Sequence, residues 1–265
     1  MTALARGARG ATGFGPAATL ARAHLALFYW WRHGRWPDLD QPRLFTEWVQ
    51  WRKLYDRCPD RARLTDKAHG KRIATEILGS DMVVPTYWAG PELPAEPPWP
   101  LPFIVKANHG CGQFVVVRNA GDWARARTAA PRWVAGCYGA VLGEWHYAAA
   151  TAGVIVEPYL GGPNALPLDF KIYVFGGRAP IVQLHEGRGR RHRWTQFDRD
   201  WRPLSNAPSG HPKPASLEQM IAAAELLGSG HDFVRVDFFE IDDRPLFGEF
   251  CLFPGSGRPR ACPAG

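Results

Sequence analysis

The chain has 265 residues, of which 46% are hydrophobic and 22% charged, and its formal net charge is +7. This composition is ordinary for a globular protein, and the length suits one large domain or two small lobes with a buried core. The longest apolar run near the start, residues 25–31, is far too short to cross a bilayer, and the first residues lack a signal-peptide core with a small-residue cleavage site, so we expect a cytoplasmic protein without a transmembrane segment.

The positive charge is concentrated at the start of the chain. Residues 1–64 contain eleven Lys or Arg and five Asp or Glu, a balance of +6, whereas the remainder contains twenty-one and twenty, a balance of +1. This distribution argues against a nucleic-acid-binding surface. The basic, weakly patterned segment 1–40 is compatible with peripheral association with a membrane or an anionic polymer, and also with a solvated chain start.

Two helices are predicted in the first third of the chain. The segment 63–79 is typical of a helix that Thr65 or Asp66 caps at its start and Gly79 ends. The earlier segment 45–57 has helical spacing of large side chains. Its predicted apolar face consists of Phe45, Trp48, Trp51, Leu54 and Tyr55.

The rest of the sequence alternates strands, hairpins and helices without an internal repeat. The expected elements are a short strand at 82–89, a proline-rich loop at 90–102, a strand–loop–strand unit at 103–119, a helix at 122–140, a strand at 153–162, a hairpin at 169–185, a basic loop at 188–198, a helix at 217–228 and a second hairpin at 233–253. Hairpins with helices laid against them predict an α+β fold with two sheets.

A glycine-bearing loop follows the strand that ends at Lys106. The letters HGCGQ come next, and glycines let backbone N–H groups approach an anion while a lysine supplies charge. The Walker pattern is absent, so this loop indicates a phosphate site only weakly. A tight hairpin with a surface lysine is the alternative.

Two carboxylates are predicted to face each other in the last hairpin. Asp237 and Glu249 are equally distant from its turn near Asp243. Facing carboxylates repel unless a cation lies between them, and Mg²⁺ is often held by one or two carboxylates plus substrate phosphates. The alternative is a pair of solvated acids. Arg235 shares their face of the strand, either to stabilise a phosphoryl group or as a simple ion pair with Asp237.

Three further positions are candidates for a nucleotide site. Lys67 opens a predicted helix, where an anion is favoured, and Lys171 lies among apolar strand residues. Either lysine is also compatible with a surface residue whose stem packs on the protein. Glu157 ends a strand before a proline turn, which is a natural hinge for a purine ring. The basic loop 188–198 suits phosphates, an acidic substrate or a solvated loop.

These motifs in order resemble the ATP-grasp fold. The order is TDK (65–67), VKANHG (105–110), VEPYLGG (156–162), DFKIYVFGG (169–177), RVDFF (235–239) and GEFCLFPGSG (248–257). More narrowly, the chain resembles the TupA-like ATP-grasp family, which is associated with teichuronopeptide and other surface-polysaccharide gene clusters. FTEWVQWRKLYDR (45–57), GEWHY (143–147) and RxxxFDRDW (193–201) are further markers, and the resemblance covers roughly residues 40–257.

The resemblance implies two α/β lobes with mainly antiparallel sheets that enclose a nucleotide cleft. It implies ATP and Mg²⁺ as cofactors, with Asp237 and Glu249 as metal ligands and Arg235, Lys171 and Arg193 in the reaction. The residues implied to bind ATP are Lys67, Lys106, His109, Gly110, Gly112, Glu157, Tyr159, Leu160 and Lys171. The implied boundaries are a basic segment 1–40, a helical region 41–100, a small lobe 101–160, a large lobe 161–257 and a tail 258–265.

The implied activity is an ATP-dependent carboxylate–amine ligase that works through an acyl phosphate in bacterial surface-polysaccharide biosynthesis. The acceptor would be a carboxylate such as a uronic-acid glycan, and the donor an amine or amino acid. A glycosyltransferase-like protein and a non-catalytic binding module are the alternatives. Five scattered cysteines without zinc-type spacing agree with a reducing compartment.

Two features depart from the family pattern. Many ATP-grasp enzymes have Asn two residues after the metal-binding Glu, and here that position is Cys251. A thiol is a poor Mg²⁺ ligand, so a second metal site would be weaker or filled by another residue such as Asn206. We also expect a further segment after the PGSG motif, whereas the sequence reaches only Gly265.

Overall fold

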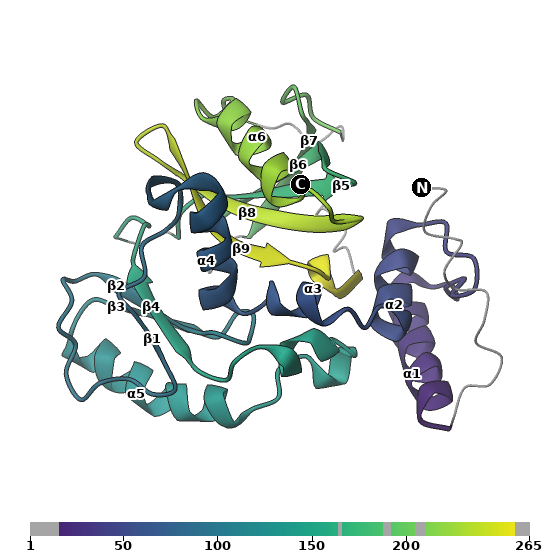
Figure 1. The fold of residues 1–265 in the computed structure, drawn as a ribbon, viewed down its shortest axis with the longest axis horizontal. Coiled ribbons are helices and arrows are strands. Elements are labelled where there is room, and N and C mark those ends of the chain that lie inside the picture. The colour runs from purple at the N-terminus through teal and green to yellow at the C-terminus, as the bar shows by residue number, and fades with distance from the viewer. Residues whose placement is uncertain (1–15, 164–165, 188–191, 205–209, 258–265) are drawn as a thin grey trace.

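The computed structural model describes residues 16–163, 166–187, 192–204 and 210–257. In this part of the chain two antiparallel sheets lie next to each other, with helices on their outer faces (Figure 1). The predicted α+β architecture is therefore confirmed. The proposed Mg²⁺ ligand Asn206 and residues 188–191 of the basic loop lie outside the described residues.

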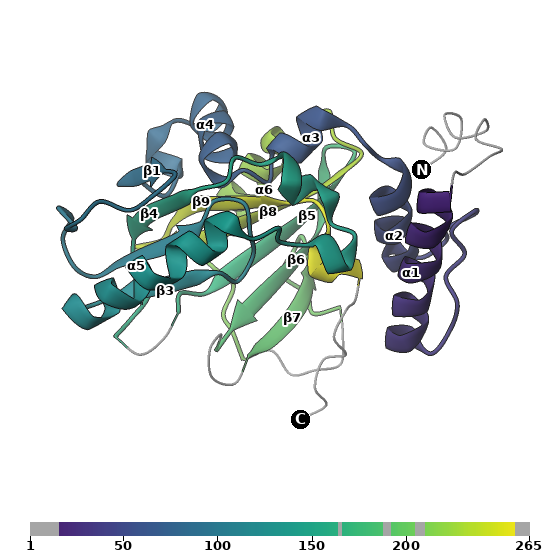
Figure 2. The same cartoon turned by 90° about the horizontal axis from the view of Figure 1, so that it is seen from below.

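The small sheet has the strand order β1-β4-β2-β3. Its strands are β1 (Trp88–Gly90), β2 (Phe103–Ala107), β3 (Phe114–Val117) and β4 (Val154–Pro158). Helix α5 (Ala120–Ala135) lies along one face of this sheet (Figure 2). Phe103, Val105 and Trp123 pack together between helix and sheet, and the opposite face of the sheet is left for the cleft.

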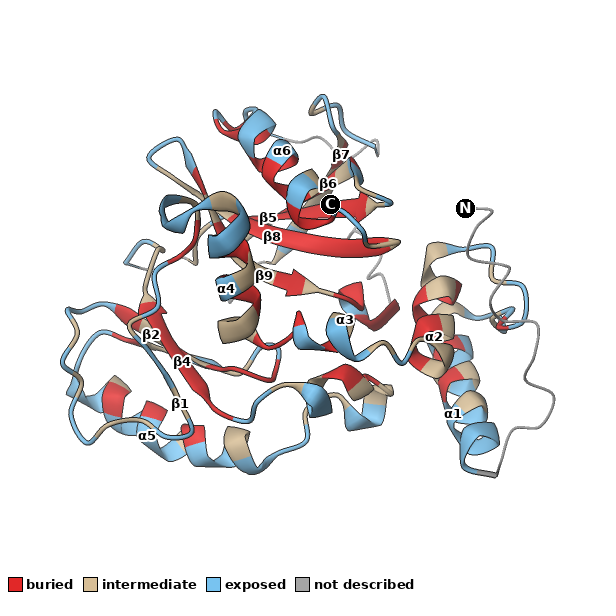
Figure 3. Ribbon diagram, viewed as in Figure 1, coloured by how far each residue is buried: buried red, intermediate tan, exposed pale blue. Residues whose placement is uncertain are grey.

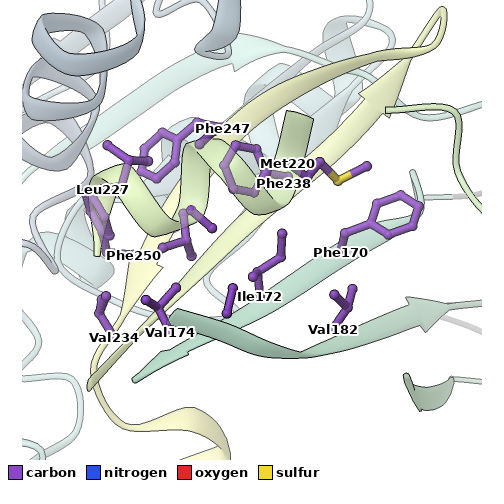
Figure 4. Close-up of a cluster of buried hydrophobic side chains, with 14 of the residues drawn as sticks. Phe170, Ile172, Val174, Val182, Met220, Leu227, Val234, Phe238, Phe247 and Phe250 are labelled. Atoms are coloured by element: carbon purple, nitrogen blue, oxygen red, sulfur yellow. The ribbon is translucent and has the colours of Figure 1, made fainter. Parts of the chain in front are cut away.

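The large sheet has the order β7-β6-β5-β8-β9. Its strands are β5 (Asp169–Phe175), β6 (Arg178–Glu186), β7 (Arg193–Asp198), β8 (Phe233–Ile241) and β9 (Arg244–Cys251). Helices α6 (Leu217–Leu227) and α4 (Lys67–Leu78) cover one face. Strand alternation turns Phe170, Ile172 and Val174 toward that helical layer, as Figure 4 shows. The charged residues between them face the other way.

Most of the predicted elements are confirmed. Asp66 caps α4 by accepting a hydrogen bond from the His69 backbone N–H, and Gly79 follows the helix with φ +86°. Asp237 pairs directly with Glu249 across β8 and β9, as the hairpin arithmetic predicts. The predicted strand 82–89 is mostly wrong, because its regular pairing begins only at Trp88.

The predicted loop at 188–198 is also partly wrong. Residues from Arg193 form β7, which pairs with β6 along its whole length. Alternating side chains in RWTQFD permit this, and Phe197 is buried in the large core. Because the segment is rich in arginine, it was interpreted as a loop, and the alternation of side chains typical of a strand was not recognised.

Helices α1 (Pro16–His33), α2 (Phe45–Tyr55) and the short α3 (Pro59–Arg63) precede the sheets. The first two lie side by side at one end of the molecule, away from α5, in both views (Figures 1 and 2). In the part of the chain described by the structure, no helix is long and apolar enough to cross a bilayer.

The predicted apolar face of α2 is not its most buried face. Its aromatic residues are half-buried, whereas Glu47, Gln50 and Lys53 are each 3% exposed. Gln50 and Lys53 contact the short 3₁₀ turn η5 (Pro254–Gly257). Burial of polar side chains against a backbone turn cannot be recognised from hydrophobic spacing alone.

Candidate nucleotide and metal site

A cleft lies between the two sheets. It is bounded by the loop between β2 and β3, the segment after β4, the start of α4 and strands of the large sheet. The space between its protein atoms, part of it open to solvent, is about 960 Å³. The predicted residues that line it are Lys67, Lys106, Gly110, Gly112, Glu157, Tyr159, Leu160, Asp237 and Glu249.

Asp237 is the centre of a buried ion-pair network on the large sheet. Arg235 donates from Nε to Oδ1 and from Nη2 to Oδ2, both at 2.7 Å. Lys171 Nζ lies 2.6 Å from Asp237 Oδ2 and 2.6 Å from Asp169 Oδ2. Burial alone would raise the pKa of Asp237, but Arg235 and Lys171 outweigh it and hold that pKa well below its usual range. The network is locally neutral, with two carboxylates and two cations.

The pairing of Asp237 with Glu249 provides donors for a magnesium ion. Glu249 lines the cleft with a side chain that is 37% exposed, and Lys67 Nζ lies 3.7 Å from its Oε2. Among the described residues no group of three or more His, Cys, Asp or Glu side chains is placed to share a metal. Two facing carboxylates are a donor set that could hold Mg²⁺ together with nucleotide phosphates.

Cys251 faces Arg235 across the β8–β9 pair. Burial raises the pKa of the Cys251 thiol to about 12, against the lowering effect of Arg235 and with a smaller raising contribution from Asp237. The thiol is therefore protonated at neutral pH. A protonated thiol does not supply the hard oxygen ligand that Mg²⁺ prefers.

We expect Cys251→Asn to lower the Mg²⁺ concentration that half-saturates ATP-dependent activity by about tenfold, because the amide oxygen adds a hard ligand. A magnesium titration of nucleotide turnover measures this change. Cys251→Ala is the control, and its magnesium requirement should match that of the parent protein. A much weaker magnesium response in Cys251→Ala would show that the thiol itself binds the ion.

Glu157 on β4 lies between two lysines. Its Oε1 accepts a hydrogen bond from Lys71 on α4, and its Oε2 accepts one from Lys106 on β2 at 2.5 Å. Burial alone would raise the pKa of Glu157, but Lys106 and Lys71 lower it to about 2. The carboxylate in turn raises the pKa of Lys106 against the effect of burial. Lys106 therefore stays charged where it lines the cleft.

This arrangement changes the expected role of Glu157. Its carboxylate is engaged by lysines, whereas the sequence suggested that it holds adenine and ribose at a hinge. The residues that follow it, Tyr159 and Leu160, line the cleft beside it. The hinge expectation thus rests on these two residues and on their backbone.

The loop between β2 and β3 is tied to the start of α4. Lys67 Nζ donates to the carbonyl of Gly110, and the Lys67 backbone N–H donates to Asn108 O at 3.3 Å. The side chain of Asn108 accepts from the Ala68 N–H at 3.0 Å. One helix N-terminus, one lysine and the glycine loop are therefore at the same edge of the cleft. The first N–H groups of α4 are bonded to Asn108 and Asp66, so the positive charge at this edge comes from Lys67.

Two of the predicted loop residues contribute through backbone geometry and one lies behind the loop. Gly112 has φ +73°, which disfavours other side chains, and a Cβ on Gly110 would lie 2.1 Å from Gln113 Oε1. His109 is 4% exposed and accepts from the Gly153 N–H at 3.3 Å through Nδ1. His109 supports the loop from behind and is not part of the cleft lining.

Arg193 is not brought to this cleft. It is an exposed residue at the start of β7, opposite Glu186, and strand alternation directs it away from the face that carries Asp169. A role for Arg193 in the reaction is therefore not supported by its position. Arg193 was expected near the cleft because it begins the motif RxxxFDRDW (193–201). In the structure the start of this motif forms β7, the edge strand of the large sheet.

Two residues of the site were not singled out in the sequence analysis. Lys71 lies one helical turn after Lys67 and contacts Glu157, and Asp169 lies two strand positions before Lys171 and lines the cleft. Both could have been found by extending the helix and strand periods from the residues already selected. Asp169 belongs to the quoted motif at 169–177 without an assigned role, and Lys71 lies outside the quoted motifs.

Comparisons with known proteins show what the chain is similar to. The family model described as TupA-like ATPgrasp matches residues 47–264. No curated protein matches the chain. Among solved structures, the L-amino acid ligase from Bacillus licheniformis is similar with a TM-score of 0.47 and 14% identity, over 74% of this chain and 42% of that one.

Two D-alanine–D-alanine ligases are similar to the same extent. The Bacillus anthracis enzyme complexed with ATP has a TM-score of 0.45 and 15% identity, over 73% of this chain and 60% of that one. The Helicobacter pylori enzyme has a TM-score of 0.44 and 15% identity, over 74% and 53%. The chain thus spans less than two thirds of each. Because the family model covers most of its length, the chain belongs to the TupA-like ATP-grasp family.

Proposed function

We propose that this protein is an ATP- and Mg²⁺-dependent carboxylate–amine ligase that acts through an acyl phosphate. The observation that carries the proposal is the convergence of Lys67, Lys106, Asp237 and Glu249 on one cleft. The lysines would bind phosphate oxygens of ATP, and the two carboxylates would bind the magnesium ion that accompanies them. Family membership supports the same reaction class.

The chemistry requires activation of a carboxylate. Its oxygen attacks the γ-phosphorus of ATP, the bond to the β-phosphate oxygen breaks, and ADP leaves with the electron pair. The amine nitrogen then attacks the carbonyl carbon of the acyl phosphate, inorganic phosphate leaves, and the nitrogen loses a proton to give the amide. Neither step needs a protein nucleophile, so positioning and charge neutralisation carry the catalysis.

The residues of the cleft match these needs. Lys67, Lys106 and the backbone of the glycine loop would bind phosphate oxygens. Bound Mg²⁺, held by Asp237 and Glu249, would neutralise charge on the terminal phosphates. Arg235 lies under this pair and would stabilise negative charge on the acyl phosphate. Closure of the glycine loop would exclude the water that otherwise hydrolyses an acyl phosphate.

We further propose that the acceptor is a carboxylate on a surface polysaccharide or its precursor, such as a uronic acid, and that the donor is an amino acid or similar amine. This substrate class rests on the family resemblance. We place the reaction in the cytoplasm, where ATP is available and where the unpaired thiols Cys58, Cys111, Cys137 and Cys251 would remain reduced.

ATP with Mg²⁺ is expected to raise the melting temperature by about 5–10 °C at a hundredfold excess over the dissociation constant. The same mixture with a uronic acid and an amino acid should release inorganic phosphate. Thermal shift and phosphate assays measure both effects. UDP- and GDP-sugars are the controls, because stabilisation by a nucleotide sugar in place of ATP would indicate a glycosyltransferase.

A non-catalytic binding module is the second candidate, and one observation favours it. Both carboxylate oxygens of Asp237 already form ion pairs with Arg235 and Lys171, so this carboxylate is occupied before any metal ion binds. ATP-dependent stabilisation without phosphate release for any carboxylate–amine pair would support this alternative. Turnover would exclude it.

A further inference from the structure

Helix α1 and the residues just after it expose several large apolar side chains. Leu20, Leu27 and Trp31 follow one another at helical spacing and are 70%, 56% and 70% exposed, and Trp30 stacks on the exposed Trp36 at 5.8 Å. We call these five residues the α1 stripe. In Figure 3 most of α1 is exposed or intermediate, in contrast to β8. Several exposed large apolar side chains on one element indicate a binding surface.

The inner face of α1 is already bound to the protein. Arg22 Nη1 donates to the Tyr55 hydroxyl at 2.7 Å, and the Tyr29 hydroxyl lies 2.9 Å from Thr46 Oγ1. At its end His33 Nε2 lies 3.1 Å from the carbonyl of Gly257. The helix is therefore held by its other face, and the α1 stripe is free to meet something outside the molecule.

The stripe lies in a segment with a positive net charge. Residues 1–40 contain five arginines and two aspartates, a balance of +3, and Arg22 and Arg35 pair with Asp40 and Glu47. A second copy of the same helix would bring the same positive charge, so self-association through this face is disfavoured. A surface with negative charge and an apolar interior matches both properties, and an anionic lipid bilayer has them.

The composition of the stripe points to the same partner. Leucine buries readily in the acyl region, and tryptophan favours the boundary between headgroups and acyl chains. The helix is shorter and less apolar than a spanning helix, so it suits a position in the plane of the interface. The family model begins at residue 47, so α1 lies outside the part that forms the nucleotide cleft.

We propose that α1 is an interfacial helix that attaches the protein to an anionic membrane surface through the α1 stripe. Because His33 on the inner face of α1 contacts Gly257, attachment fixes the turn η5, which follows β9, on the protein side of the helix. This inference does not depend on the reaction that the cleft catalyses.

Vesicle co-sedimentation of the full chain tests the proposal. The probes are vesicles of phosphatidylcholine with phosphatidylglycerol and vesicles of phosphatidylcholine alone. We expect binding to the first and little to the second, with loss of binding as salt increases. The double substitution Leu27→Gln with Trp31→Gln should lower the partition coefficient by about tenfold or more, because two exposed apolar side chains are removed.

The matched control is Leu226→Gln, an exposed leucine on α6 that is 58% exposed and distant in sequence from the stripe. It should bind vesicles like the parent protein. A second double substitution, Leu20→Gln with Leu27→Gln, leaves Trp31 in place. It keeps the test valid if replacement of the tryptophan prevents folding. Unchanged sedimentation in both double variants overturns the proposal. A parent dimer that the same substitutions convert to a monomer also overturns it and assigns the stripe to a second copy.

Discussion

Replacement of Asp237 by Asn is expected to lower the free energy of unfolding by about 3–5 kcal/mol and to abolish ATP turnover. Asp237 is 2% exposed and is contacted at 2.6–2.7 Å by both Arg235 and Lys171. The neutral amide would leave the two buried cations, Arg235 and Lys171, with one buried carboxylate in the network, that of Asp169. Urea unfolding and phosphate release measure the two losses.

Glu249→Gln is the matched control because it makes the same chemical change on the facing strand position. Its side chain is 37% exposed and its contact to Lys67 is 3.7 Å, so the free energy of unfolding should change by no more than about 0.5 kcal/mol. Magnesium-dependent ATP turnover should nevertheless be lost. Equal destabilisation by both substitutions would contradict the assigned difference between the two carboxylates.

The Asp237 ion pairs also fix the direction of a pH effect. The folded-state pKa of Asp237 is held below its value in the unfolded chain, which is about 3.9. Its contribution to stability is therefore complete above that pH and is lost as the pH falls through the folded-state value. Asp237→Asn should remove this part of the acid sensitivity.

The facing of Asp237 and Glu249 could be predicted from the sequence because residues equally distant from the turn of a hairpin pair across it. Once the turn was assigned near Asp243, the register of Asp237 and Glu249 followed from counting. The fold class followed in the same way from hairpins and amphipathic helices. Local rules of turn position and side-chain period were sufficient for both.

The charge network could not be predicted because its members come from distant segments. Lys171 and Asp237 are 66 residues apart in sequence and meet only because β5 pairs with β8. Lys71 and Glu157 are 86 residues apart and meet only because α4 lies beside the small sheet. No local pattern contains such contacts, and the order of strands in the sheet decides them. The same limit explains why Glu157 was interpreted as a base-binding residue.

Glu157→Gln is expected to lower the free energy of unfolding by about 3–5 kcal/mol, because it leaves the buried Lys71 beside Lys106 without a carboxylate between them. Burial, together with repulsion from Lys106, already lowers the pKa of Lys71 against the attraction of Glu157. Loss of the carboxylate should lower it further. Urea unfolding at neutral pH measures the change in stability.

A second substitution and a pH series separate charge from packing in this triad. Glu157→Gln combined with Lys71→Met removes the buried lysine that has lost its carboxylate, so it should recover most of the lost free energy of unfolding. If Glu157→Gln acted only by disturbing packing, the double substitution would lower that free energy further. The pKa of Glu157 is lowered from 4.5 to about 2, so its contribution is present above about pH 4.5 and decreases as the pH falls toward 2. The difference in unfolding free energy between the parent protein and Glu157→Gln should therefore narrow below pH 4.5. A difference that stays constant through this range would show that the lysines of the cleft are not held by the charge of Glu157.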